Sequence, residues 1–312
     1  MYKIPLLVLA FLCNFSVFAN EYPNKPITIV IGYPPGGGTD LVGRYIFGKL
    51  SHKTHWTIVI ENKPGATGVI ASRDISKSKP DGYRLLLGHI APNAINPGDF
   101  TDPKIPIDWN LIPIVRIATA PLVLLSYAGS KILDIGYFDI LRSTESIIYG
   151  SDGVGSLSHL QMHSLLNDAN SVHIPYKGGA PAMMGLLSKD VPVLFSPLPV
   201  ALPYIKSNKV VVLLHTGINN IDLLPEIKSI HRVYRNQLSG ELWWGLFAPV
   251  GIPTDILALW ERNIQEIMQE PETQNWLSEQ GYTYGYMSTE EFSKFVSIEI
   301  KKWKEVSDSI RK

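Results

Sequence analysis

The residues best suited to chemistry lie in a glycine-rich turn that reads GYPPGGGTD from Gly32 to Asp40. The turn follows an apolar, strand-like run and leads into a helix-like segment. Glycines let backbone N–H groups point into such a turn, and the following helix adds the positive end of its dipole. The pattern predicts a site for an anion such as a carboxylate, although a tight turn without a ligand has the same residues.

Nucleotide-phosphate motifs do not fit this turn. A phosphate loop reads G-x-x-x-x-G-K-[ST], in which the lysine reaches the terminal phosphates. Gly32 and Gly37 have that spacing, but Gly38 stands in place of the lysine. The dinucleotide motif G-x-G-x-x-G fails as well, because Leu41 stands in place of its last glycine. Nucleotide binding is therefore disfavoured.

A second glycine-rich turn lies in IIYGSDGVGSLSHL, residues 147–160. It contains Gly155 and adds the hydroxyl groups of Ser151 and Ser156. The two turns are more than a hundred residues apart, so we expect them on different lobes. Together they suggest one anion held from both sides.

Motifs for metal binding or hydrolysis are incomplete. His159 and His163 have the spacing of a zinc-protease motif, but Leu160 replaces its glutamate. No G-x-S-x-G is present, and Ser156 has no glycine two residues later. Asp152 has two interpretations, an acid/base partner of His159 or a turn residue. We expect no metal, no cofactor and no enzyme activity.

Three further residues have open roles. Lys177 lies in a turn bounded by proline and glycines, where it either attracts an anion or belongs to a solvated loop. Trp243 and Trp244 either line a cleft or pack where the chain crosses between lobes, and the second interpretation is preferred.

These residues depend on an alternating pattern of strands and helices for their positions. The strand-like runs are residues 27–31, 56–60, 83–87, 122–125, 147–149, 191–195 and 210–214. Helix-compatible stretches at 40–50, 156–166 and 181–187 separate several of them. This alternation predicts an α/β protein with largely parallel sheets covered on both faces. The last sixty residues form packing helices, one of which begins with a Ser288–Glu291 capping box.

Composition limits the class of protein. The 312 residues are 45% hydrophobic and include 28 basic and 28 acidic side chains, which cancel. The length suits two lobes better than one. A nucleic-acid-binding protein would show a basic excess, so nucleic acid is not an expected partner.

The N-terminus has the pattern of a secretory signal peptide. Lys3 precedes an apolar run from Ile4 to Phe18, and Ala19 follows as the small residue before a cleavage site. We expect cleavage after about Ala19, with an uncleaved anchor as the alternative. The single cysteine, Cys13, lies in this segment, so the mature chain would have no disulfide and no thiol.

Several stretches taken together resemble the receptors of tripartite tricarboxylate transporters, the Bug or TctC family. They are YPNKPITIVIGYPPGGGTDLVGR, ENKPGATG, KPDGYRLLLG, HIPYKGGAPAMMGLL, ALPYIKSNKV and WWGLFAPVGIP, in this order from Tyr22 to about Trp303. The resemblance implies a periplasmic solute receptor with a two-lobed, Venus-flytrap fold of type II, in which a mainly parallel sheet flanked by helices forms each lobe. Lobe 1 would comprise residues 21–121 and 244–312, and lobe 2 residues 122–243.

The resemblance also implies the residues that grip a ligand carboxylate. The matching positions are Gly37, Gly38 and Thr39 in lobe 1 and Ser151, Gly155 and Ser156 in lobe 2. Some positions depart from the family pattern. Tyr33 replaces a phenylalanine and would add a hydroxyl group to the cleft, and the match is weaker at His89 and Asn93. Ser196 replaces an aspartate that meets a ligand amino group in many relatives, which favours a plain di- or tricarboxylate over an amino acid.

The resemblance implies a monomer that passes a small carboxylate to the subunits of a membrane transporter. Two alternatives remain at this stage. The protein would present its ligand to the outer domain of a membrane sensor kinase, or it would be an exported hydrolase that uses Ser156 or His159.

Overall fold

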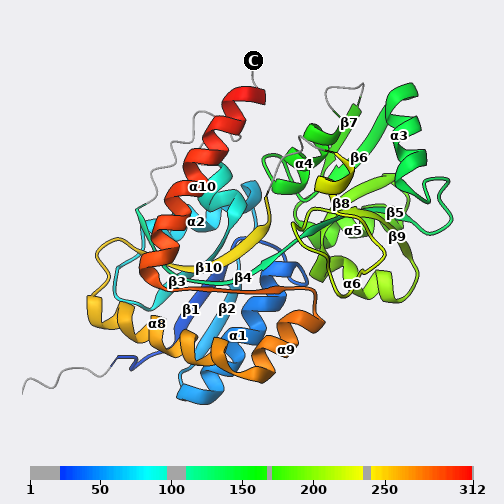
Figure 1. Ribbon diagram of the computed structural model, residues 1–312. Coiled ribbons are helices and arrows are strands. Elements are labelled where there is room, and N and C mark those ends of the chain that lie inside the picture. Colours follow the sequence, from blue (N-terminus) through cyan, green and yellow to red (C-terminus); the bar gives the residue numbers. More distant parts are fainter. Residues whose placement is uncertain (1–21, 97–109, 167–170, 235–239, 311–312) are drawn as a thin grey trace, which may run out of the picture.

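The computed structural model describes residues 22–96, 110–166, 171–234 and 240–310, and the side chains of 307–310 are not included. The predicted signal peptide lies outside the described residues. The chain forms two α/β lobes, each built on its own sheet (Figure 1). Within the described part, no helix is both long and apolar enough to cross a membrane.

Lobe 1 contains a six-stranded sheet with the order β11-β4-β10-β3-β1-β2. Its strands are β1 (Ile27–Ile31), β2 (Ile58–Asn62), β3 (Arg84–His89), β4 (Leu111–Ala120), β10 (Leu242–Pro249) and β11 (Thr283–Met287). β1 pairs in parallel with β2 and β3, whereas β10 and β11 add antiparallel pairs. The carboxyl ends of β1 and β3 therefore lie at the same edge, where the first glycine-rich turn follows.

Helices cover both faces of this sheet. They are α1 (Gly38–Thr54), α2 (Val69–Ser76), α8 (Thr254–Gln269), α9 (Pro271–Glu279) and α10 (Thr289–Ile310). In Figure 1, α2 and α10 lie above the sheet, and α1, α8 and α9 lie below it. The short helices η1 (Ala66–Gly68) and η2 (Ala91–Ile95) follow β2 and β3. The predicted capping box is confirmed, because the Ser288 amide donates to the Glu291 carboxylate at 2.9 Å.

Lobe 2 contains a five-stranded sheet with the order β7-β6-β8-β5-β9. Its strands are β5 (Leu122–Tyr127), β6 (Ile147–Ser151), β7 (Ser171–Pro175), β8 (Val193–Pro197) and β9 (Val210–His215). Its helices are α3 (Ile135–Thr144), α4 (Leu157–Leu166), α5 (Gly179–Leu187), α6 (Leu198–Lys206) and α7 (Ile230–Val233). β6 is parallel to β7 and β8, and β5 runs antiparallel to β8 and β9.

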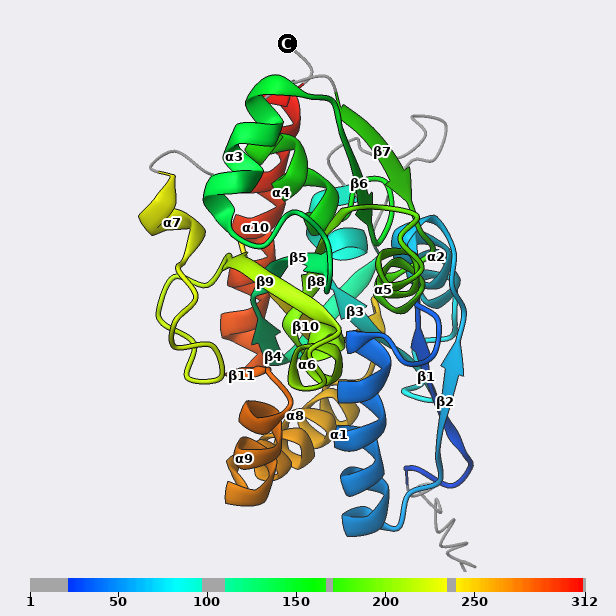
Figure 2. The same ribbon diagram turned by 90° about the vertical axis from the view of Figure 1, so that its right-hand side faces the viewer.

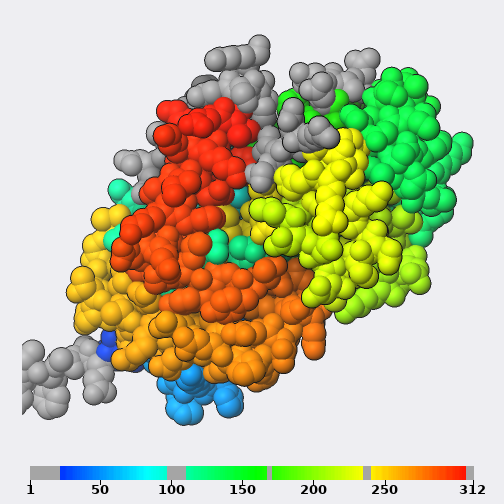
Figure 3. Space-filling view, in the orientation of Figure 1, coloured from blue at the N-terminus to red at the C-terminus, as the bar shows by residue number. Residues whose placement is uncertain are grey.

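The predicted two-lobed α/β class is confirmed, but both sheets are mixed rather than mainly parallel. The antiparallel pairs arise where the chain passes between the lobes. β4 ends at Ala120 and β5 begins at Leu122, so a single residue separates strands of different sheets. β10 returns to lobe 1 and inserts between β3 and β4. Figure 3 shows the lobes in contact on the face that carries α9 and α10.

Candidate functional site

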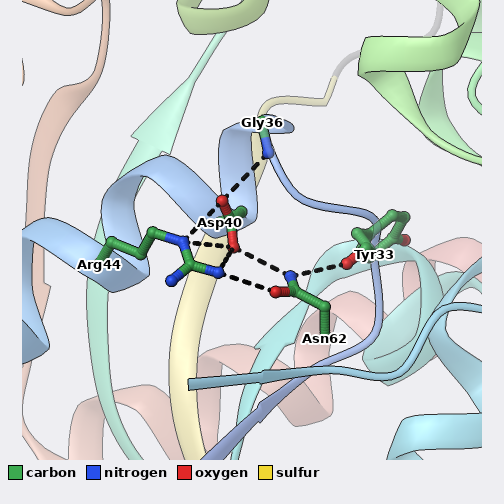
Figure 4. A network of polar contacts seen from close by, with 5 residues as sticks. All are labelled: Tyr33, Gly36, Asp40, Arg44 and Asn62. Carbon is green, nitrogen blue, oxygen red and sulfur yellow. Dashed lines mark hydrogen bonds and ion pairs between the residues drawn. The ribbon is translucent and has the colours of Figure 1, made fainter. Parts of the chain in front are cut away.

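The first glycine-rich turn owes its shape to Asp40, which is buried in the first turn of α1. The Asp40 carboxylate accepts hydrogen bonds from the Gly36 amide at 3.0 Å, from Arg44 at 2.9 Å and from the side-chain amide of Asn62 at 2.9 Å. Asn62 also donates to the Tyr33 carbonyl at 3.0 Å, so that one network joins β2, the turn and α1 (Figure 4).

Electrostatics keep Asp40 ionised. Burial raises the pKa of this carboxyl, but the hydrogen bonds from Arg44, Gly36 and Asn62 and the Arg44 charge outweigh burial and hold the pKa below its usual value. The carboxylate therefore stabilises the turn from behind. The first-turn N–H groups of α1 have no carbonyl within the helix to bind, so they remain available to a ligand.

Thr39 and Gly38 are tied to the rest of lobe 1. The Trp244 indole N–H donates to the Thr39 hydroxyl oxygen at 2.8 Å, and the Tyr282 hydroxyl donates to the Gly38 carbonyl at 2.6 Å. Trp244 therefore meets the turn directly, whereas Trp243 packs inside the lobe and donates to Glu299. The preferred interpretation, in which both tryptophans pack where the chain crosses between the lobes, fits Trp243. It does not fit Trp244, because the antiparallel β10–β3 pairing brings Trp244 beside His89 at the edge of the turn.

Tyr33, His89 and Asn93 form a second layer under the turn. The Tyr33 hydroxyl donates to the Thr67 carbonyl at 3.0 Å and lies 3.1 Å from His89 Nδ1. The Ala91 amide donates to the same nitrogen at 3.4 Å. Burial lowers the pKa of His89 to about 3, so the ring is neutral. Asn93 accepts the His89 amide at 3.0 Å and fixes the β3–η2 turn.

The second glycine-rich turn, between β6 and α4, is held by its own hydroxyl groups. Ser156 Oγ donates to the Gly153 carbonyl at 2.7 Å, and Ser151 Oγ lies 2.7 Å from His173 Nε2. Gly155 has a φ of +72°, a conformation that favours glycine, and its amide donates to His159. Ser151 and Ser156 are fully buried, so their side chains shape the turn from within.

A small cavity of about 20 Å³ lies where the lobes meet. This volume holds a single water molecule. Lobe 1 contributes Tyr33, Pro34, Gly37, Gly38, Thr39, His89 and Trp244, and lobe 2 contributes Asp152, Gly179, Ala180 and Pro197. Gly38 and Thr39 begin α1, and Gly179 and Ala180 begin α5. The N-termini of two helices from different lobes therefore meet at one point, and Figure 2 shows the start of α1 below α5.

A larger cavity of about 620 Å³ adjoins the small one. Tyr33, Pro34 and Asp152 line both cavities. The remaining walls come from Gly32 and residues 64–67 in lobe 1 and from residues 153–154 and 175–178 in lobe 2. Lys177 is among them and is exposed, which is compatible with both interpretations of this residue.

The lobes are in contact around these cavities. The Thr67 hydroxyl donates to the Val154 carbonyl across the cleft at 2.9 Å. Gly178 has a φ of +119°, and a Cβ atom there would lie 3.1 Å from Pro34 of the other lobe. The two lobes therefore touch across the cleft, and the small cavity between them has no room for a ligand larger than water.

The ten predicted ligand-binding residues divide into two groups. Five line the small cavity, namely Tyr33, Gly37, Gly38, Thr39 and His89. The other five do not line either cavity, namely Asn93, Ser151, Gly155, Ser156 and Ser196. Ser196 is buried, and its hydroxyl donates to the Pro197 carbonyl at 3.4 Å. Sequence analysis did not assign Ala180 or Pro197 to the site, although the motif KGGAPA marks a glycine-rich helix start.

The geometry does not assemble a catalytic group from the residues considered. Among the described residues, Asp152 and His159 form no hydrogen bond, and the Asp152 carboxylate instead accepts one from Ser158. His159 stacks on His173 with ring centroids 4.1 Å apart. No group of three or more His, Cys, Asp or Glu side chains in the described chain is arranged to hold a metal ion.

Comparison with known proteins identifies the family. The sequence profile of the tripartite tricarboxylate transporter family receptor matches residues 42–311. The chain belongs to this receptor family. Its members are periplasmic solute-binding proteins, which confirms the resemblance seen in the sequence.

Similar proteins cover almost the whole chain. Protein BugT of Bordetella pertussis is 29% identical over 294 residues, which is 92% of this chain and 90% of BugT. A solved periplasmic transporter is 26% identical with a TM-score of 0.86, over 92% of this chain and 97% of the other. An R. palustris protein solved with adipate shares the fold, with 24% identity and a TM-score of 0.85 over 92% and 98% of the two chains.

Proposed function

We propose that this protein is a periplasmic receptor that captures a small carboxylated metabolite between its two lobes and delivers it to a tripartite tricarboxylate-type membrane transporter. The observation that carries the proposal is the meeting of the α1 and α5 N-termini at one cavity. Free N–H groups and the positive ends of two helix dipoles favour an anion there. A ligand held by one helix end from each lobe links binding to closure of the cleft.

The surrounding residues suit recognition without turnover. Gly37, Gly38, Thr39 and a neutral His89 line the small cavity and offer backbone N–H groups, a hydroxyl group and an imidazole for hydrogen bonding. Charge-assisted hydrogen bonds to a carboxylate strengthen when closure removes water. A micromolar dissociation constant corresponds to about −8 kcal/mol, which a few such bonds supply.

The relatives point to the same ligand class. The R. palustris protein that shares this fold was solved with adipate, a dicarboxylate. The family profile names a tricarboxylate transporter receptor. We therefore expect the ligand of this chain to carry at least one carboxylate.

The test is a thermal-unfolding screen of residues 20–312, refolded to remove any bound ligand, against citrate, dicarboxylates, aromatic acids and amino acids. A ligand at 1,000 times its dissociation constant stabilises the fold by about 4 kcal/mol. That ligand should lose most of its effect on Thr39→Val, which removes a hydroxyl group from the cavity. Failure of every carboxylate to raise the melting temperature would refute the receptor proposal.

A further inference from the structure

One side chain in the cleft is not explained by binding of a carboxylate alone. Asp152 is buried and lines both the small and the large cavity. It lies on the second glycine-rich turn, where its carboxylate accepts a hydrogen bond from Ser158. Asp152 therefore borders the same space as the starts of α1 and α5.

No positive group of the described protein compensates this carboxylate. Asp152 forms no ion pair within the described residues, and its hydrogen-bond donors are the neutral hydroxyls of Ser158 and Ser156 and its own amide. Burial raises the pKa of Asp152, and these hydrogen bonds only partly oppose it. Asp152 in turn contributes to the raised pKa of Tyr33. A buried carboxylate without a cation is costly, so a ligand cation beside it would be strongly favoured.

The two cavities define where the parts of such a ligand would lie. The small cavity is bounded by the starts of α1 and α5 and also by Asp152. Because this cavity is small, the backbone amides at the helix ends lie close to Asp152. The negative and positive groups of a ligand that binds both must therefore be neighbours. The adjoining cavity of about 620 Å³ has room for the remainder of the molecule.

We propose that Asp152 determines specificity by binding the ammonium group of an amino acid whose carboxylate lies at the two helix ends. The amino-acid side chain then extends into the larger cavity, between Tyr33, Tyr176 and Lys177. This inference rests on the proposed receptor function and names its substrate class.

The inference changes the expectation based on Ser196. A serine at that position favours a plain carboxylate over an amino acid only if no other carboxylate reaches the ligand. Ser196 donates to the neighbouring Pro197 carbonyl and does not line either cavity. Asp152 supplies the carboxylate from a different loop of the same lobe.

The experiment compares amino acids with the same acids lacking the amino group. Calorimetric titrations of the wild type would use glutamate against glutarate, leucine against 4-methylpentanoate, phenylalanine against 3-phenylpropanoate, and lysine against 6-aminohexanoate, with citrate as a plain tricarboxylate. The variant is Asp152→Asn, and the matched control is Asp222→Asn, an exposed aspartate of the same lobe.

We expect at least one amino acid to bind more tightly than its partner, by about tenfold or more. Asp152→Asn should weaken that amino acid at least about 30-fold while leaving its partner nearly unchanged, because the ammonium group loses its buried counter-charge. Asp222→Asn should behave as wild type.

The outcomes separate this inference from the receptor function. Binding of citrate or a deaminated acid in preference to every amino acid overturns the role of Asp152 but supports a carboxylate receptor. An equal loss of affinity for both compounds of a pair in Asp152→Asn also overturns the role of Asp152, because such a result indicates damage to the turn. Absence of binding by every compound overturns the receptor function and this inference with it. The wild-type comparison holds even if the variant fails to fold.

Discussion

At the residue scale, the proposed anion site is shaped by buried polar groups that do not line the small cavity. Asp40 holds the first turn through Gly36, Arg44 and Asn62. Asn93 and Ser156 fix the backbone of neighbouring turns in the same way. Substitutions at these positions should therefore change binding through the shape of the turn.

Asp40→Ala tests this support. We expect a loss of about 2 to 3 kcal/mol in the free energy of unfolding, since the Gly36 amide and Asn62 lose a buried partner. Ligand affinity should fall as well, because the α1 N-terminus loses its fixed turn. Chemical denaturation and calorimetry measure the two effects. Glu290→Ala, which removes an exposed ion pair with Lys294, is the control and should change neither. An Asp40→Ala protein with wild-type affinity would contradict the argument.

His89 predicts a dependence of stability on pH. Unfolded histidine has a pKa of about 6.5, whereas burial lowers the pKa of folded His89 to about 3. The unfolded state therefore binds more protons as pH falls below about 6.5, and stability falls with it. At pH 5 the loss from His89 is about 2 kcal/mol. Urea unfolding at pH 7.5 and pH 5 should show a smaller loss in His89→Gln than in wild type, and an equal loss would be inconsistent with a buried neutral ring.

The candidate site could be predicted from the sequence only in part. The motif GGGTD marked the first turn because glycines before a helix have a local signature, and the family resemblance selected Gly37, Gly38 and Thr39 within it. Trp244 reaches the same cavity through the pairing of β10 with β3, and Asp152 reaches it where the two lobes meet. No local sequence pattern encodes either arrangement. The hydroxyls of Ser151 and Ser156 have the right chemistry in sequence, yet burial turns them inward.

At the element scale, the sequence was most informative for elements marked by a short hydrophobic run or by a helix cap, because both signals depend only on neighbouring residues. β1 has its predicted bounds, and the box at the start of α10 is formed. β4, β7, β10 and β11 were not predicted. β10 is buried along its whole length, so its sequence does not alternate between apolar and polar residues. β7 is a largely exposed edge strand. Their assignment needs the partner strands.

The α10 capping box gives a stability prediction. Ser288→Ala should lower the free energy of unfolding by about 1 kcal/mol, because the Glu291 amide loses the hydroxyl acceptor and the box loses one of its bonds. Thermal or chemical unfolding measures the change. Ser297→Ala, an exposed position within the same helix, should have almost no effect. Equal effects of the two substitutions would show that the box does not stabilise the helix.

At the scale of the whole molecule, the proposed function requires one lobe to move against the other. The lobes are joined where β4 passes into β5 and where the chain enters β10. The small cavity holds one water molecule when the cleft is closed. The proposed function therefore requires a carboxylate to bind a form with separated lobes and to stabilise the form in which they meet, which would shift the population of conformations.

Small-angle X-ray scattering measures this shift. The radius of gyration of the ligand-free protein should decrease when a saturating ligand from the screen is added. Thr67→Val removes the hydrogen bond to Val154 across the cleft, so it should weaken closure and reduce the decrease. A radius of gyration that is the same with and without ligand would argue against closure.

The most direct measurement is a calorimetric titration of that ligand into wild type, Ala180→Asn and Ala180→Asp. Ala180 lies in the first turn of α5 and lines the small cavity from lobe 2. Asparagine and aspartate have nearly the same shape, and aspartate is well tolerated at a helix N-terminus, so the two variants differ mainly in charge. If a carboxylate is held between the helix ends, Ala180→Asp should bind the ligand at least about tenfold more weakly than Ala180→Asn. The cause is repulsion between the new aspartate and the ligand carboxylate, which amounts to several kcal/mol at most. Equal affinities in the two variants would contradict an anion held between the lobes.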